Sequence, residues 1–285
     1  MIRRLALAAG TIALATPLAA QEAPPAGSGD VYDGTVFDGD YLTIGAGVAY
    51  LPSYTGSDDY VLTPFPAVQG SIAGIDITPR AGGVALDFIP DAGSGPDLAL
   101  GVAARIRRDR ATQIEDPVVA SLGELDTAFE VGPSAGISFP AVLNPYDSLS
   151  FNADVLWDVA GAHDGMSITP SVTYFTPLSR GIAASLSVSA NHVDDDFADY
   201  YFSVTPAASL TSGLPVYDAD SGFRDVGATL FVAYDLDGDL TNGGFAIAGL
   251  AGYSSLLGDF KETPFTSIRG DADQYFVGLG LGYTF

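Results

Sequence analysis

Few residues in this chain could do chemistry. The sequence has no cysteine and two histidines, His163 and His192, which lie close to Asp164 and Asp194 respectively. A histidine beside a carboxylate can serve as a general base or activate a nucleophile. Both pairs fall at the ends of predicted loops, where such neighbours are usually ordinary surface groups. We therefore predict that the protein is not an enzyme and assign no catalytic residue.

Two further motifs fail the tests for bound ligands. The stretch 235–244 (DLDGDLTNGG) spaces three aspartates like the start of a calcium loop, but Leu240 takes the glycine position and Ala246 that of the closing glutamate. The run GLGLG at 278–282 has neither the spacing of a dinucleotide-binding turn nor a helix after it. We expect no metal and no cofactor.

The elements that carry these residues are predicted from a period of two. From Asp273 to Phe285, apolar residues alternate with glycines and polar residues, so one face of an extended strand is apolar and the other nearly bare. The same alternation recurs at 44–50, 98–106 and 149–159. Segments of about ten residues with these two faces are typical of a transmembrane β-barrel, with lipid outside and a polar lumen.

A secreted β-sandwich is the alternative, because its strands alternate as well. Three features favour the barrel: the apolar faces end in aromatic residues, glycines gather on the opposite face, and the chain ends on an aromatic residue. A terminal aromatic resembles the signal that bacterial outer-membrane proteins present to their assembly machinery. We therefore assign Tyr283 and Phe285 as a barrel-assembly signal and expect that machinery to be a partner.

The predicted fold class is all-β: a transmembrane antiparallel β-barrel of about 12 strands, with short periplasmic turns and long extracellular loops. Pro64, Pro66 and Pro170 fall inside strands, which suggests bulges or edges there. The pair of segments between Ile75 and Phe88 is the least regular, so ten strands are the alternative. The strands are predicted at 43–51, 60–72, 74–79, 83–88, 97–108, 125–139, 147–159, 166–176, 181–192, 223–236, 244–254 and 273–285.

The start of the chain predicts export. Arg3 and Arg4 precede a short apolar run and small residues near Ala20, the pattern of a secretory signal peptide. We assign 1–20 as the signal peptide, 21–42 as a flexible N-terminal segment and 43–285 as the barrel, located in the outer membrane. The formal net charge of −24 makes nucleic acid an implausible partner. Acidic residues gather in the predicted outer loops. Divalent cations could bridge them there to lipopolysaccharide. We expect lipopolysaccharide and the lipid of the outer membrane as partners.

Charged residues are also predicted inside the barrel. Five of them lie on three successive strands and point inward: Arg105, Arg107, Glu130, Asp154 and Asp158. In a narrow barrel such charges are expected to pair across the lumen. The long loop from Asp194 to Gly222 is expected to cover the mouth with seven residues: Tyr200, Tyr201, Phe202, Pro206, Leu214, Pro215 and Tyr217.

Several stretches resemble the MltA-interacting protein/outer-membrane protein V family of Gram-negative bacteria. They are YLPSYTGSDDYVLTPFP at 50–66, LAGYSSLLGD at 250–259, the final ADQYFVGLGLGYTF, and above all the loop with YYFSVTP and GLPVYD. The resemblance implies an outer-membrane barrel that scaffolds a lytic transglycosylase and a murein synthase during peptidoglycan remodelling. The alternative function is a small-solute channel or a porin-like protein of osmotic or antibiotic responses.

Overall fold

The computed structural model describes residues 34–90 and 95–285. The predicted signal peptide (1–20) and residues 21–33 of the predicted N-terminal segment lie outside the described residues. Residues 34–40 precede the first strand, where the N–H of Val36 donates to the carbonyl of Thr241 (2.8 Å). Phe37 is buried with its ring edge against Tyr41. This part of the predicted N-terminal segment therefore packs on the barrel end.

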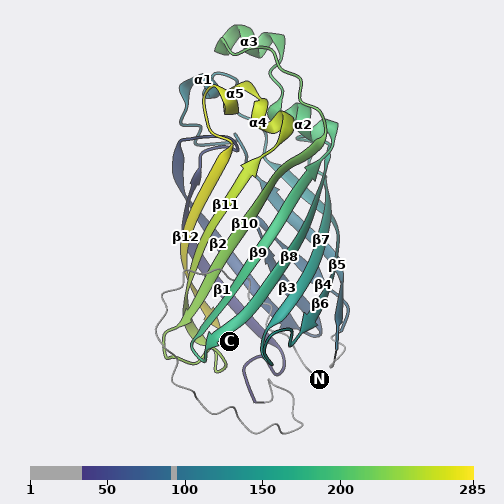
Figure 1. The fold of residues 1–285 in the computed structure, drawn as a ribbon, viewed down its shortest axis with the longest axis vertical. Coiled ribbons are helices and arrows are strands. Elements are labelled where there is room, and N and C mark those ends of the chain that lie inside the picture. Colours follow the sequence, from purple (N-terminus) through teal and green to yellow (C-terminus); the bar gives the residue numbers. More distant parts are fainter. Residues whose placement is uncertain (1–33, 91–94) are drawn as a thin grey trace.

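Twelve strands form one closed antiparallel barrel in which each strand pairs with its neighbours in sequence and β1 pairs with β12 (Figure 1). The predicted fold class is confirmed, and the alternative of ten strands is wrong. The strands are β1 Tyr41–Pro52, β2 Tyr60–Ile72, β3 Ile75–Arg80, β4 Gly83–Asp87, β5 Asp97–Arg107, β6 Ala128–Pro140, β7 Ser148–Asp158, β8 Met166–Ser179, β9 Ile182–Val193, β10 Gly222–Asp235, β11 Gly244–Leu256 and β12 Asp273–Thr284.

The two faces of the strands divide as the period of two predicts. On β1, Ile44 and Val48 are exposed on the outer surface, and on β12 so are Val277 and Leu279. The glycines between these residues face the lumen. A β8 proline expected at an irregularity, Pro170, lies where the ladder with β9 is interrupted between Ile168 and Ser171. The apolar outer surface suits a lipid environment.

Short helices lie at one end of the barrel, and the C-terminus and the short turns lie at the other (Figure 1). We call these the loop end and the turn end. The helices are α1 Pro117–Ala120, α2 Asp195–Phe202, α3 Pro206–Ser212, α4 Gly258–Glu262 and α5 Pro264–Ser267. Asp194 caps α2 by accepting from the N–H of Phe197, and Thr205 caps α3 through Ala208. Within the described residues, no helix has the length and apolar character needed to cross a membrane.

Candidate functional site

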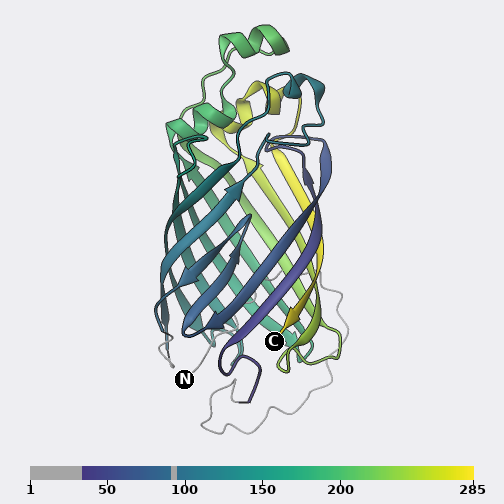
Figure 2. The same ribbon diagram turned by 180° about the vertical axis from the view of Figure 1, so that it is seen from behind.

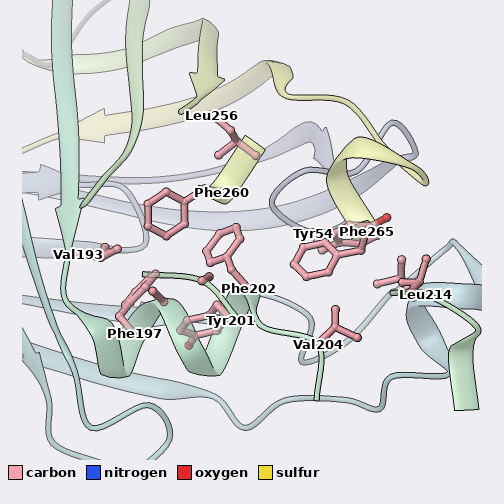
Figure 3. Close-up of a cluster of buried hydrophobic side chains, with 13 residues drawn as sticks. Tyr54, Val193, Phe197, Tyr201, Phe202, Val204, Leu214, Leu256, Phe260 and Phe265 are labelled. Carbon is pink, nitrogen blue, oxygen red and sulfur yellow. The ribbon is translucent and has the colours of Figure 1, made fainter. Parts of the chain in front are cut away.

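The mouth of the barrel is covered by a hydrophobic core built from four separate loops, which we call the cap. Its buried members are Tyr54, Val119, Val193, Phe197, Ala198, Tyr201, Phe202, Val204, Leu214, Ala219, Leu256, Phe260 and Phe265. Figure 3 shows Phe202 of α2 between Phe260 of α4 and Phe265 of α5. The ring of Phe202 lies 4.9 Å from that of Phe260 and 5.9 Å from that of Phe265, between centroids. The packed core lies at the loop end of the barrel (Figure 1).

The long loop supplies only part of this core. Among the seven residues predicted for the cap, Tyr201, Phe202 and Leu214 are buried in it, and Tyr200 and Tyr217 pack against it. Pro206 and Pro215 are exposed instead, because the segment around α3 projects beyond the cap (Figure 1). The sequence reasoning missed Tyr54, Phe260 and Phe265, which come from the β1–β2 and β11–β12 loops. Their presence in otherwise polar loops was the available signal.

Polar contacts hold these loops together. Thr263 donates to the carbonyl of Phe202 at 2.7 Å, and the hydroxyl of Tyr217 donates to the carbonyl of Asp259 at 3.0 Å. Burial raises the pKa of Tyr217 to about 12, with nearby acids adding to the shift, so its phenol remains a donor at neutral pH. Arg269, from the β11–β12 loop, donates twice to Asp116 at the start of α1, at 2.6 and 3.0 Å.

A charged layer lies beneath the cap, centred on Glu130 of β6. The Glu130 side chain is fully buried (0% exposed) and accepts from Nε of Arg105 at 2.6 Å and from Nε of Arg107 at 2.7 Å. The two arginines lie on β5, where Arg105 is directly opposite Glu130 in the ladder. A buried carboxylate needs such partners, because an unpaired charge inside a protein is costly. We call Arg105, Arg107 and Glu130 the charged layer.

The charged layer also contacts the cap. The guanidinium of Arg107 lies over the ring of Phe197, and His163, in the β7–β8 loop, packs against Phe197 at 4.9 Å between ring centroids. Nε2 of His163 is 3.2 Å from Oε1 of Glu130, and Nδ1 accepts from the N–H of Gly165. Because Nδ1 accepts this bond, Nε2 is the ring nitrogen placed to donate to Glu130.

The other two predicted lumen charges are placed differently. The Asp158 carboxylate accepts from backbone N–H groups in the turn that follows β7, among them those of Ala162 and His163, and makes no arginine pair within the described residues. Asp154 pairs with Arg80 of β3 at 2.8 Å and accepts from Ser134 at 2.6 Å. The sequence analysis did not identify Arg80, because it falls in the predicted turn between the segments 74–79 and 83–88, whereas the structure places it at the end of β3.

Neither histidine–aspartate pair considered from the sequence forms. His163 contacts Glu130, and His192 lies edge-on to Phe223, while Asp194 caps α2. In the described part of the chain, no group of three or more His, Cys, Asp and Glu could hold a metal ion. The Asp235 carboxylate accepts from the N–H groups of Asp237, Gly238 and Asp239, which is the geometry of a hairpin turn.

A closed antiparallel barrel with an apolar outer surface and a packed cap is the architecture of a membrane-spanning β-barrel protein. The family model described as MltA-interacting protein MipA matches residues 44–285, and the chain belongs to this family. A comparison with curated proteins found no match to the sequence.

Solved structures that align with this chain include outer-membrane proteins. An outer-membrane channel from Pseudomonas putida has 12% sequence identity and a TM-score of 0.47, covering 87% of this chain and 96% of that one. OprD from Pseudomonas aeruginosa has 12% identity and a TM-score of 0.36, covering 87% and 66%. OmpT of Vibrio cholerae has 9% identity and a TM-score of 0.35, covering 86% and 97%.

Proposed function

We propose that the protein is a non-enzymatic barrel of the outer membrane that binds a partner of the peptidoglycan machinery rather than serving as an open pore. The observation that carries this proposal is the cap together with the charged layer below it. An axial path would have to cross a packed aromatic core and then the buried Arg105–Glu130–Arg107 group. Opening that path would expose apolar area and break buried ion pairs, and both changes are unfavourable.

The identity of the partner comes from the family. Its description names an MltA-interacting protein, and the resemblance noted above implies a lytic transglycosylase and a murein synthase. With the long loops facing outward, the turn end faces the periplasm, where peptidoglycan enzymes act. The partner therefore binds at the turn end in this proposal, and lipopolysaccharide contacts the acidic loop end.

The turn between β6 and β7 is the surface that we assign to the partner. The Asp147 carboxylate accepts from the N–H groups of Val142, Leu143 and Asn144 and from the hydroxyl of Tyr174. These bonds fix the turn, and Leu143 at its tip is 78% exposed. A rigid turn that presents an apolar side chain loses little conformational entropy on binding.

Binding and conductance measurements test the proposal together. The purified protein is expected to show no steady conductance in a planar bilayer and to retain a purified lytic transglycosylase of the class named by the family. Leu143→Asp should weaken this binding about tenfold, equivalent to about 1.4 kcal/mol. Leu236→Asp changes another leucine near the turn end that is 52% exposed, and it should have no effect. Robust conductance without enzyme binding would instead favour the channel function.

A further inference from the structure

The barrel wall is incomplete between β2 and β3. β2 pairs with β1 along its whole length, but only residues 70–72 pair with β3, opposite residues 75–77. Figure 2 shows the two strands together at the turn end and apart toward the loop end. We call the unpaired stretch along residues 62–69 of β2 the lateral seam; it corresponds to about 26 Å of strand at about 3.3 Å per residue.

The sequence itself prevents the seam from closing into a ladder. Pro64 and Pro66 are two residues apart, so their nitrogens face the same edge of β2, and the continuous ladder with β1 assigns that edge to the seam. Pro79 stands on the facing strand. Proline has no N–H to donate, and this confines it to strand edges. For the same reason, a peptide strand added along this edge would lack donors.

Residues along the seam are exposed on both faces of β2. Leu62, Pro64 and Pro66 are exposed on its outer side. Ala67 pairs with Gly45, so its side chain points toward the lumen, and yet it too is exposed. At this position β2 has no ladder partner on the side of β3. The unpaired edge is therefore the part of the wall through which the lumen would be reached from the side, away from the cap.

A buried donor without a partner lies at the lower end of the seam. Gln69 is the first residue of β2 beyond the pairing with β3, and its side chain has the inward orientation of Ala67 and Ser71. Gln69 is 8% exposed, and its Nε2 has no hydrogen-bond partner. Buried amide groups are almost always paired, since an unmade bond costs free energy. A ligand carbonyl or carboxylate at this position would supply the missing acceptor.

The lumen wall beside the seam is lined by glycines and by Phe65. Gly45 and Gly47 of β1 face the lumen directly opposite Gly282 and Gly280 of β12, which leaves a smooth wall beside β2. The ring of Phe65 approaches Gly47, where an added Cβ would be only 2.6 Å from Cζ of Phe65. The ion pair of Arg80 with Asp154 ties the facing hairpin to β7, away from β2.

We propose that the lateral seam admits the acyl chain of a free fatty acid from the bilayer, whose carboxyl end accepts a hydrogen bond from Nε2 of Gln69. The polar end lies in the lumen, and the chain extends along Phe65 and the glycine wall through the seam into lipid. The inference rests on the membrane location proposed above and is independent of the transglycosylase. It adds a lateral binding site for free fatty acids to a barrel whose mouth carries the cap.

Fluorescence quenching tests this site, because the chain has one tryptophan, Trp157. Trp157→Phe with Phe65→Trp places the only tryptophan beside the seam, and Trp157→Phe with Phe231→Trp is the matched lumen control on β10. Nitroxide-labelled stearic acid should quench the first reporter saturably, with competition by unlabelled palmitic acid, and the second at least threefold less. Gln69→Leu should weaken binding and raise the half-saturation concentration about tenfold.

Equal, non-saturable quenching of both reporters, or no effect of Gln69→Leu, would overturn the proposal. Quenching by brominated phospholipid with no saturable response to stearic acid would show that bilayer lipid fills the seam, and would also overturn it. Val68→Cys with Pro79→Cys, joined by a short bifunctional thiol reagent, should block quenching. The same treatment of Ala46→Cys with Leu281→Cys, a directly opposed pair of β1 and β12, should leave quenching intact. Conductance and transglycosylase binding by these samples report separately on the proposed function.

Discussion

The guanidinium carbon of Arg107 lies 4.8 Å from the centroid of the Phe197 ring. Arg107 belongs to the lumen face of β5 and donates to Glu130, whereas Phe197 lies on α2 in the core of the cap. The contact therefore joins the charged layer to the cap. A cation over an aromatic face is attracted to the ring. Loosening the cap therefore removes this favourable contact from Arg107.

We expect the charged layer to be essential for stability. Arg105→Ala with Arg107→Ala leaves the buried Glu130 carboxylate with no arginine partner and only the His163 contact, which should lower the free energy of unfolding by about 3–5 kcal/mol. Urea unfolding in lipid vesicles measures this change. Adding Glu130→Ala removes the uncompensated charge and should restore part of the loss. A double variant as stable as the parent would show that the layer is hydrated in solution.

The strand pattern was readable from the sequence, whereas the composition of the cap was not. Outward residues such as Val48 and Leu279 alternate locally with glycine, so each strand carries its own signal. The cap core joins Tyr54 to Phe265 across more than two hundred residues, with ring centroids 6.1 Å apart. No local period predicts such a contact, because it depends on how the barrel brings separate loops to one end.

The charged residues of the lumen could also be predicted only in part. The alternation of side chains along each strand predicted that Arg105 and Glu130 lie on the lumen face, and the ladder places them directly opposite each other. The same alternation put Asp158 there, but its carboxylate accepts from the backbone of the turn after β7. An aspartate at the end of a strand can satisfy a turn or an arginine equally well, and the sequence does not distinguish the two.

Removing the β9–β10 part of the cap should open the axial path. Val193 and Gly222 are paired across β9 and β10, so a short Gly-Ser linker can replace residues 195–220 without separating the strands. Combined with Arg105→Ala and Arg107→Ala, this replacement should produce steady conductance in a planar bilayer. The linker variant with both arginines intact should conduct less, because the charged layer remains. If the combined variant is folded but silent, a further obstruction lies in the lumen.

The cap core should respond to truncation of a buried ring. Phe260→Ala removes a 2% exposed side chain that packs against Phe202, and should destabilise the cap by about 3–5 kcal/mol. Limited proteolysis of the folded barrel measures this as faster cleavage within the loops. Leu210→Ala is the control, since Leu210 is 90% exposed on α3 and should leave the cleavage rate unchanged. Equal rates for both variants would contradict a packed cap.

The cap should also weaken in acid through Asp116. Burial acts to raise the pKa of this carboxyl, but hydrogen bonds from Arg269 and from the N–H groups of Val119 and Val118 outweigh it and hold the pKa below its ordinary value. A lowered folded-state pKa stabilises the cap above the unfolded-state value of about 4, and this contribution is lost as the pH falls through the folded-state pKa.

Hydrogen exchange of the loop amides between pH 7 and pH 3 measures this contribution, after correction for the intrinsic exchange rate. Asp116→Asn should expose the α1 amides already at pH 7 and make their protection nearly independent of pH. Asp58→Asn changes an exposed acid at the same end of the barrel and should preserve the pH dependence of the parent. The same acid response in Asp116→Asn and the parent would assign the effect to another group.

Phe285 remains a predicted assembly signal. Its surroundings allow an effect on assembly to be distinguished from an effect on the stability of the assembled barrel. Its side chain is 65% exposed, its ring lies 4.7 Å from that of Tyr283 between centroids, and its N–H donates to the carbonyl of Leu42. Phe285→Ala keeps the backbone bond and should change the unfolding free energy of the assembled barrel by less than about 1 kcal/mol. In cells, the same variant should reduce the heat-modifiable, folded fraction several-fold. Tyr275 is an exposed aromatic residue on the loop-end half of β12, and Tyr275→Ala should not reduce that fraction. An equal loss in both variants would indicate a general need for aromatic residues rather than a terminal signal.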